Sequence, residues 1–399
     1  MAQKNILFIT PVFPSLRGRG RNFRAYQWVS HLQKNNRVSV FCTSIYGSDD
    51  VEDDNSLDEL VCDVYQSHHT YSTFQRVINL LSLKPSTWNA VGDVIEQEIE
   101  RLNIPEPDVI LCFRIQNAST ALHLKKRWKN SEIWLDIDEV DSRVRFSIAK
   151  TMGSSGYYLR AMKESVEGIF YAIQEFLKIR RFDTIFTSTR EELEYLEKLN
   201  YSTKTKTFKN KLPIFHGQAN GFMQEAPYQF MFVGDSNYFP NLDAIDFLLF
   251  EIIPGLDEEA SMPFNFIIIG GDIGNRQLDQ IKKYDCVTFY RDVDDLTGIY
   301  HQANAVIVPL RTGGGSSLKF LEALKYKKPV VATPVGARGF EVSDGVQALI
   351  GEDYESMIKH CQTLMNNPAF ALKIAENGHQ WFVENHSFKV AMEEDLEAV

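Results

Sequence analysis

The chain has 399 residues, of which 44% are hydrophobic and 24% are charged, and this ordinary composition excludes a disordered or fibrous protein. One hydrophobic core rarely serves so long a chain, so the length favours two or three domains. The net charge is −11, and residues 1–210 carry 28 Lys and Arg against 27 Asp and Glu, which leaves nearly all of the negative charge in the remaining residues. A basic nucleic-acid surface is therefore not expected in that second half.

The first elements alternate between strand and helix. Residues 5–10 (NILFIT) are predicted to form a buried strand, residues 22–35 a helix, and residues 37–43 (RVSVFCT) a second strand. The loop before the helix contains Gly18 and Gly20, but no third glycine completes a dinucleotide-binding fingerprint, so a nicotinamide cofactor is disfavoured. No apolar run reaches the roughly 20 residues of a spanning helix and no signal-peptide cleavage region precedes the first strand, so we expect a cytoplasmic protein.

The middle of the chain continues this alternation. Strands are predicted at 108–113, 133–138 and 183–189, a long amphipathic helix near 157–181, and a further helix at 190–199. Residues 201–228 lose all periodicity and are predicted to be the connection between two domains.

Several groups of residues have an ordinary structural explanation. The five cysteines are scattered without metal-type spacing and are predicted to be reduced core residues. The acidic segment 47–59 is predicted to be a surface loop. Two basic groups, at 17–24 and 125–129, fit a solvated surface, and contact with an anionic acceptor or an anionic membrane leaflet stays open for both.

A glycine-rich turn near residue 313 is the most informative feature. Apolar runs at 304–310 and 328–336 are predicted to be neighbouring parallel strands. Between them, the glycines at 313–315 allow close approach of a ligand, and Ser316 and Ser317 are expected to cap a helix whose free N–H groups favour an anion. Because ligands bind at the carboxyl ends of strands in open parallel sheets, the turn is predicted to hold a phosphate, although it also fits an ordinary strand-to-helix turn.

Four further stretches carry a family resemblance. Three lie in the second half, namely FMFVGDSNYFPNLDAIDFLLFEIIPGL at 230–256, FNFIIIGGD at 264–272 and VTFYRDVDDLTGIYHQANAVIVPL at 287–310. The fourth, WLDIDEVDSRVRF at 134–146, lies in the first half. In this order they resemble the retaining glycosyltransferases of family 4, and within them the sugar transferases of bacterial exopolysaccharide clusters.

The resemblance implies an α/β protein of the GT-B fold, in which two Rossmann-like domains face each other across a cleft. Residues 1–210 would form the acceptor-side domain, residues 211–375 the nucleotide-sugar-binding domain, and residues 376–399 a helix returning to the first domain. The implied activity is the transfer of a sugar from a UDP-, GDP- or dTDP-linked donor to a glycan or lipid-linked glycan, with retention of anomeric configuration. The resemblance implies no cofactor, metal or nucleic acid, and it leaves open a peripheral place at the inner face of the membrane.

Roles for particular residues also follow from the resemblance. Glu322 is expected to hold sugar hydroxyls of the donor, and the loop with Gly18 and Gly20 to contact the acceptor or the donor phosphate. Asp138 stands about where the family places a histidine near the donor sugar, and it is expected to act in catalysis together with Arg24. Expected donor-binding residues are Gly234, Gly314, Gly315, Ser316, Ser317, Leu318, Lys319 and Glu322.

The chain departs from the family in one respect. Many members carry two glutamates eight positions apart across this loop, and here Gly314 replaces the first, which puts the donor sugar in doubt more than the nucleotide. A nucleotide-sugar 2-epimerase of the same fold and a catalytically silent subunit that binds a partner transferase therefore stay open. Asp136 and Asp138 also form an Asp-x-Asp pattern, for which a metal is the minor alternative, whereas Asp141 and Ser142 are expected to cap a helix.

Overall fold

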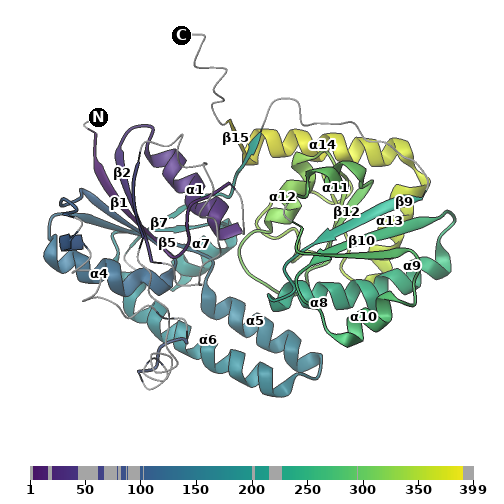
Figure 1. Ribbon diagram of the computed structural model, residues 1–399, viewed down its shortest axis with the longest axis horizontal. Coiled ribbons are helices and arrows are strands. Elements are labelled where there is room, and N and C mark those ends of the chain that lie inside the picture. The colour runs from purple at the N-terminus through teal and green to yellow at the C-terminus, as the bar shows by residue number, and fades with distance from the viewer. Residues whose placement is uncertain are drawn as a thin grey trace, which may run out of the picture. The chain divides into compact units, whose positions relative to one another are not determined.

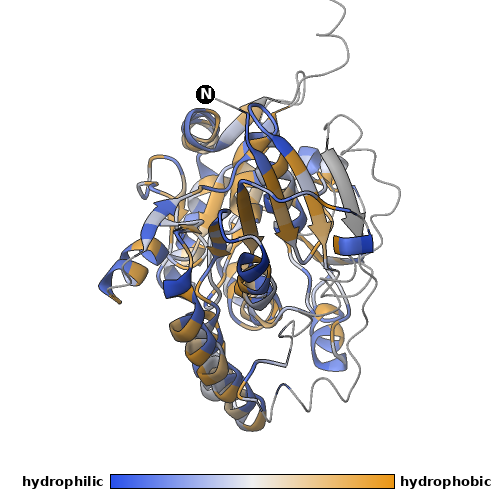
Figure 2. Cartoon of the chain, turned by 90° about the vertical axis from the view of Figure 1, so that its left-hand side faces the viewer, coloured by the Kyte–Doolittle hydropathy of each residue, from blue (hydrophilic) through white to orange (hydrophobic). Residues whose placement is uncertain are grey.

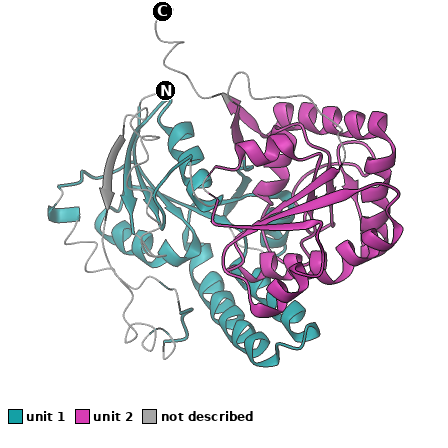
Figure 3. Ribbon diagram, turned by 45° about the vertical axis from the view of Figure 1, so that its right-hand side comes forward, with its two compact units in different colours: residues 1–210 teal, residues 211–399 magenta. Residues whose placement is uncertain are grey.

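The computed structural model describes residues 3–16, 20–43, 62–66, 79, 82–86, 88, 99–101, 103–199, 203–214, 227–293 and 295–389. The chain divides into two compact units, residues 1–210 and 211–399, and each unit has its own parallel sheet (Figure 3). The predicted α/β class with two Rossmann-like domains is confirmed. None of the helices that the structure describes is both long enough and apolar enough to cross a membrane.

Unit 1 is built on a seven-stranded sheet in the order β3-β2-β1-β4-β5-β6-β7 (Figure 1). Every neighbouring pair is parallel, and β1 lies between β2 and β4. The strands are β1 (Asn5–Thr10), β2 (Arg37–Cys42), β3 (Cys62–Gln66), β4 (Val109–Phe113), β5 (Glu132–Asp138), β6 (Thr184–Thr187) and β7 (Lys204–Thr207). Strands β1 and β4 are apolar and almost wholly buried, as expected for a sheet covered on both faces.

The helices of unit 1 include one long hairpin. Its arms are α5 (Asp141–Ser154) and α6 (Tyr158–Lys178), which extend together away from the sheet (Figure 1). The other α-helices are α1 (Gly20–Leu32), α4 (Ala118–Arg127) and α7 (Arg190–Lys198), and short 3₁₀ turns lie at Ile115–Asn117 and Ile179–Arg181. The long helix predicted near 157–181 is therefore present.

Unit 2 repeats the plan with a six-stranded parallel sheet in the order β11-β10-β9-β12-β13-β14. Its strands are β9 (Tyr228–Val233), β10 (Phe264–Gly270), β11 (Val287–Arg291), β12 (Ala305–Val308), β13 (Val330–Ala332) and β14 (Leu349–Ile350). A separate pair joins β8 (Leu212–Ile214) to β15 (Ser387–Lys389), also in parallel.

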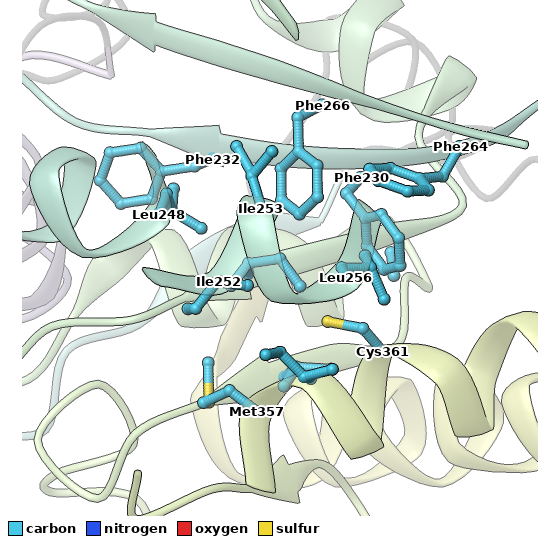
Figure 4. Close-up of a cluster of buried hydrophobic side chains, with 14 of the residues drawn as sticks. Phe230, Phe232, Leu248, Ile252, Ile253, Leu256, Phe264, Phe266, Met357 and Cys361 are labelled. Atoms are coloured by element: carbon cyan, nitrogen blue, oxygen red, sulfur yellow. The ribbon is translucent and has the colours of Figure 1, made fainter. Parts of the chain in front are cut away.

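Helices cover both faces of this second sheet, with α8 and α10 on one side and α11, α12 and α14 on the other (Figure 1). They are α8 (Phe239–Phe247), α9 (Ile253–Glu259), α10 (Asn275–Ile281), α11 (Thr297–Gln302), α12 (Leu318–Lys325), α13 (Tyr354–Asn366) and α14 (Pro368–His386), with a π-helix at Leu248–Ile252 between α8 and α9. Phenylalanines of β9 and β10 pack on the π-helix and α9, and α13 closes this core with Met357 and Cys361 (Figure 4).

Two expectations about the connections differ from the structure. Residues 201–228 were expected to have no regular structure, but β7 and β8 lie within them. Strand β7 reads Lys-Thr-Lys-Thr at the edge of its sheet, so its side chains stay partly exposed and give no apolar signal. At the other end, α14 runs without interruption through residue 376 and belongs to unit 2. The return of the last residues to unit 1 concerns residues 390–399, outside the described part of the chain.

Candidate functional site

The loops that follow β9 and β12 begin side by side in unit 2. These strands are neighbours in the sheet, although the chain forms β10 and β11 between them. At such a point, connections leave toward opposite faces of the sheet, and open α/β sheets bind their ligands there. Gly234 follows β9 directly, and the predicted glycine turn follows β12.

The glycine turn has the backbone that its sequence predicts. Gly313 has φ 133° and Gly315 has φ 59°, conformations that side chains larger than glycine's rarely adopt. The guanidinium of Arg338 donates a hydrogen bond to the carbonyl oxygen of Gly313 at 2.7 Å. The glycines therefore allow the backbone conformation of the turn, and the hydrogen bond from Arg338 stabilises it.

The helix α12 begins directly after this turn, at Leu318. Ser317 occupies the N-cap position, but its side chain makes no capping hydrogen bond, so the expected capping role is wrong for this hydroxyl. Its Oγ is buried and has no hydrogen-bond partner among the residues that the structure describes. A buried hydroxyl and the first amides of a helix therefore lie together where an anion is favoured.

Lys319 connects the two loops. Its Nζ donates a hydrogen bond to Oδ1 of Asn241 at 2.6 Å, and a Cβ placed on Gly234 would lie 2.9 Å from this Nζ. Burial lowers the pKa of Lys319 to about 7, although the nearby carboxylate of Glu322 raises it. Near neutral pH, the protonation state of Lys319 therefore depends on the charge of a ligand beside it.

Glu322 is held one turn further along α12. The hydroxyl of Tyr300 donates to its Oε2 at 3.0 Å, and the ring of Tyr300 stacks on that of Tyr326 with centroids 4.6 Å apart. Burial raises the pKa of Glu322, while the hydrogen bond from Tyr300 and the lysines of α12 oppose this rise. The carboxylate is therefore fixed in orientation by a rigid aromatic pair.

Unit 1 contains a strained pair at the carboxyl ends of β4 and β5. Arg114 has φ 69° and Asp138 has φ 61°, which is uncommon for residues other than glycine. The Arg114 guanidinium is buried and contacts three carboxylates, those of Asp138 at 3.2 Å, Glu139 at 3.1 Å and Asp141 at 2.9 Å. Strain of this kind is concentrated at functional sites, because the surrounding structure must hold it in place.

Arg24 is buried against Asp136 of β5. Its side chain is 1% exposed, and it binds both carboxylate oxygens of Asp136 at 2.7 Å. Its Nη1 also donates to the carbonyl oxygen of Phe208 and to Oδ1 of Asn210. These contacts fit a residue that positions Asp136, and the expected catalytic role of Arg24 stays a prediction.

The expected cap of α5 is also wrong. The N-cap residue is Val140, and Asp141 already lies in the first turn, where its carboxylate pairs with Arg114. The hydroxyl of Ser142 donates instead to Glu175 of α6. Burial raises the pKa of Glu175 to about 7, although the hydrogen bond from Ser142 lowers it.

The remaining predicted residues lie apart from these groups. Gly20 is the exposed first residue of α1, whereas Gly18 lies outside the described residues. Lys125 donates to the carbonyl oxygens of Lys129 and Ser131 and so closes the end of α4. In the described parts of the chain, no group of three or more His, Cys, Asp or Glu is arranged to hold a metal ion.

Solved structures of similar architecture identify the fold. A sucrose-phosphate synthase from Thermosynechococcus elongatus superposes with a TM-score of 0.70 at 14% identity, over 96% of this chain and 95% of that one. TarM superposes with a TM-score of 0.67 at 11% identity, over 99% and 97%. HepE from Anabaena, solved with UDP-glucose, superposes with a TM-score of 0.59 at 12% identity, over 96% of each chain. The two-unit architecture is that of the GT-B fold.

The sequence of unit 2 gives a more specific similarity than the fold does. Residues 227–367 match the family model of the glycosyl transferases group 1. An uncharacterized 44.6 kDa protein in the cps region of Klebsiella pneumoniae is 24% identical over 246 residues, which span 58% of this chain and 63% of that protein.

Three residues of these groups were missed by the sequence reasoning. Asn241 lies within the stretch 230–256, but nothing in the sequence marks it as the partner of Lys319. Arg114 had one usable signal, since it is a charged residue directly after the buried strand β4. Arg338 had none, because its contact with Gly313 depends on the path of the chain after β13.

Proposed function

We propose that this chain transfers a glycosyl group from a nucleotide-sugar donor to a glycan or lipid-linked glycan, with retention of anomeric configuration and without a metal ion. The observation that carries the proposal is the buried, unpartnered hydroxyl of Ser317 beside the glycine turn of unit 2. A nucleotide sugar has phosphate oxygens that can accept a hydrogen bond from this hydroxyl.

The donor diphosphate would lie against the turn and the start of α12. Gly315 leaves the backbone open to a bulky anion, and the first amides of α12 have no partners within the helix. Lys319 would add a positive charge, because an approaching diphosphate favours its protonated form. These groups stabilise the charge that develops on the departing diphosphate.

Glu322 would hold hydroxyls of the nucleotide ribose. Its carboxylate accepts from Tyr300 on one oxygen, and the other oxygen can accept from a sugar. The HepE structures contain UDP and UDP-glucose, and these support a nucleotide sugar as donor without fixing the base in this chain.

Asp138 is the proposed contact to the donor sugar or the acceptor. Its side chain is 16% exposed, whereas the side chains of Arg114 and Arg24, which both contact its carboxylate, are buried. The two arginines would keep the carboxylate in one orientation, which is how a positioned group lowers a barrier. The cps-region relative and a TarM structure with an α-GlcNAc-glycerol ligand support a glycan-type acceptor.

A thermal-shift screen of UDP-, GDP- and dTDP-sugars, followed by product analysis with candidate acceptors, tests the proposal. A specific ligand raises the melting temperature, and transfer of the sugar with the same anomeric configuration supports the function. Binding without any turnover would instead favour a catalytically silent subunit. The glycine at position 314, where many members of the resembled family have a glutamate, is consistent with this alternative. Formation of an epimeric sugar without acceptor would favour the epimerase.

A further inference from the structure

One side of the α5–α6 hairpin has no partner among the described residues of unit 1. Helix α6 packs with one face only, through the buried residues Gly168, Tyr171 and Glu175. Phe146 of α5 lies against Gly168, where a Cβ would come within 2.9 Å of its ring. The opposite face of α6 therefore points away from the unit to which the helix belongs.

That opposite face is apolar along the whole helix. Leu159 is 80% exposed and Met162 is 62% exposed, and the same side continues to the C-terminal end of the helix. Figure 2 shows hydrophobic residues running along this hairpin. We call these residues the α6 stripe: Leu159, Met162, Val166, Ile169, Phe176 and Leu177. Successive members are three, four or seven residues apart, except the adjacent Phe176 and Leu177, and this spacing places them on one side of the helix.

The carboxylates of α6 all point away from the stripe. Glu164 pairs with Arg145 of α5 at 2.7 Å, and Glu167 accepts from the backbone N–H of Ser86 at 3.1 Å. Glu175 is buried and accepts from Ser142. Every acidic side chain of α6 is thus bonded within unit 1.

The exposed charges around the stripe are positive. Arg160 and Lys163 are exposed on α6 itself, and Arg180 and Arg181 are exposed just beyond its end. Lys150 is exposed on the neighbouring helix. A long helix with exposed apolar residues and a basic rim is the pattern of helices that lie in the interface of a membrane with anionic lipids.

We propose that the α6 stripe docks this protein on an anionic membrane surface, with its apolar side chains among the acyl chains and its basic rim at the headgroups. A second copy of the chain is a poorer occupant, because a two-fold contact through the stripe would bring the basic rims of both copies together. The proposal goes beyond the proposed function, since it requires neither a sugar donor nor catalysis.

Co-sedimentation of the full chain with vesicles tests this, using phosphatidylcholine alone and phosphatidylcholine mixed with phosphatidylglycerol. We expect binding to the mixed vesicles, and a loss of roughly tenfold or more in partitioning for the double variant Leu159→Ser, Met162→Ser. The double variant Arg160→Glu, Lys163→Glu should lose the preference for anionic lipid. Both substituted pairs are exposed, so the fold should be retained, which thermal unfolding checks.

Matched controls lie in unit 2. The pair Leu278→Ser, Leu372→Ser removes leucines that are 38% and 37% exposed, and the pair Lys359→Glu, Lys373→Glu reverses two exposed charges. Neither control should change vesicle binding. The proposal is overturned if the unsubstituted chain does not bind mixed vesicles, or if the stripe variant binds as well as its control. A dimer in sedimentation velocity that the stripe variant loses, without vesicle binding, would overturn it in favour of a second copy.

Discussion

Nζ of Lys319 lies 2.6 Å from Oδ1 of Asn241, and both atoms crowd the position that a side chain at Gly234 would occupy. The position of the Lys319 side chain in α12 therefore requires a glycine at position 234, although the two residues are far apart in the sequence. Any larger residue at 234 would displace the lysine from the place where the donor phosphates are proposed to bind.

The charge of Lys319 makes nucleotide binding depend on pH. Its pKa of about 7 means that the free site loses the proton above that pH, while a bound diphosphate favours the protonated form. Affinity for the nucleoside diphosphate should therefore fall as the pH rises from 7 to 9, with proton uptake on binding. Calorimetry in buffers of different ionisation enthalpy measures both effects.

Lys319→Met is the matched control for this prediction. It should bind the diphosphate more weakly at pH 7 and should show a smaller dependence on pH. An unsubstituted chain whose affinity is the same at pH 7 and pH 9 would contradict the assignment.

Glu322→Gln should weaken binding of the nucleotide. The substitution keeps the shape of the side chain but removes charge-assisted hydrogen bonds worth about 1.5 to 3 kcal/mol, so affinity should fall roughly tenfold or more. Isothermal titration calorimetry gives the dissociation constant. Tyr300→Phe, which can keep the stacked ring, should have a smaller effect, and equal affinity for the Gln variant and the unsubstituted chain would rule out the ribose contact.

Gly315→Val should abolish binding of the diphosphate while the protein stays folded. A branched side chain at φ 59° is strained and lies at the mouth of the turn. We expect unfolding in urea to show a loss of no more than about 3 kcal/mol.

Gly345→Val is the control, because Gly345 has a similar φ of 72° with open space around it and lies outside the glycine turn. It should lose stability without losing affinity. Normal affinity in a folded Gly315→Val protein would remove the turn from the donor site.

Asp138→Asn should lower turnover by roughly a hundredfold while leaving nucleotide affinity nearly unchanged, since the carboxylate is proposed to meet the sugar or the acceptor. Steady-state kinetics and calorimetry separate the two. A requirement for Mn²⁺ or Mg²⁺, or loss of nucleotide binding in this variant, would speak for a metal at the Asp-x-Asp pattern.

Arg24→Met should lower stability, in contrast to Asp138→Asn, which should lower turnover. It leaves the buried carboxylate of Asp136 without its arginine, and we expect a loss of about 3 to 5 kcal/mol in the free energy of unfolding. If Arg24→Met instead left stability unchanged and abolished turnover, the result would support the catalytic role expected for Arg24.

Glu175 should make unit 1 less stable as the pH rises. Its pKa is raised from 4.5 to about 7, so the folded state binds the proton more tightly than the unfolded chain. The stability that this provides is complete below about pH 4.5 and is lost as the pH rises through 7. Glu175→Gln should remove this part of the pH dependence in urea unfolding at pH 5 and pH 8, and an unchanged difference between the two would contradict the assignment.

The sequence predicted the elements that depend on local pattern. The apolar run of β12, the glycines after it and the start of α12 follow one another within a few residues, and each has its own local signal. Both ends of α6 were predicted to within three residues for the same reason. The GT-B fold was implied by the resemblance to a known family, which several stretches in one order carry.

The contacts that complete each site could not be predicted, because they join residues that are distant in the chain. Arg114 and Asp138 have positive φ values and follow or end two adjacent strands, β4 and β5, whose pairing is not visible in either segment alone. Arg24 was expected to act in catalysis, and nothing in the sequence indicated that it is buried against Asp136 of β5 and Asn210 beyond β7. No pattern within one segment carries that information.

The parallel pair of β8 and β15 has a consequence for how the chain folds during synthesis. Residues 212–214 leave the ribosome before any other strand of unit 2, yet their partners are residues 387–389. Contacts of such long sequence separation form late, because the ends of a long loop must first be brought together. We therefore expect strand β8 to stay unpaired while the six-stranded sheet forms, and its pairing with β15 to be among the last steps of folding.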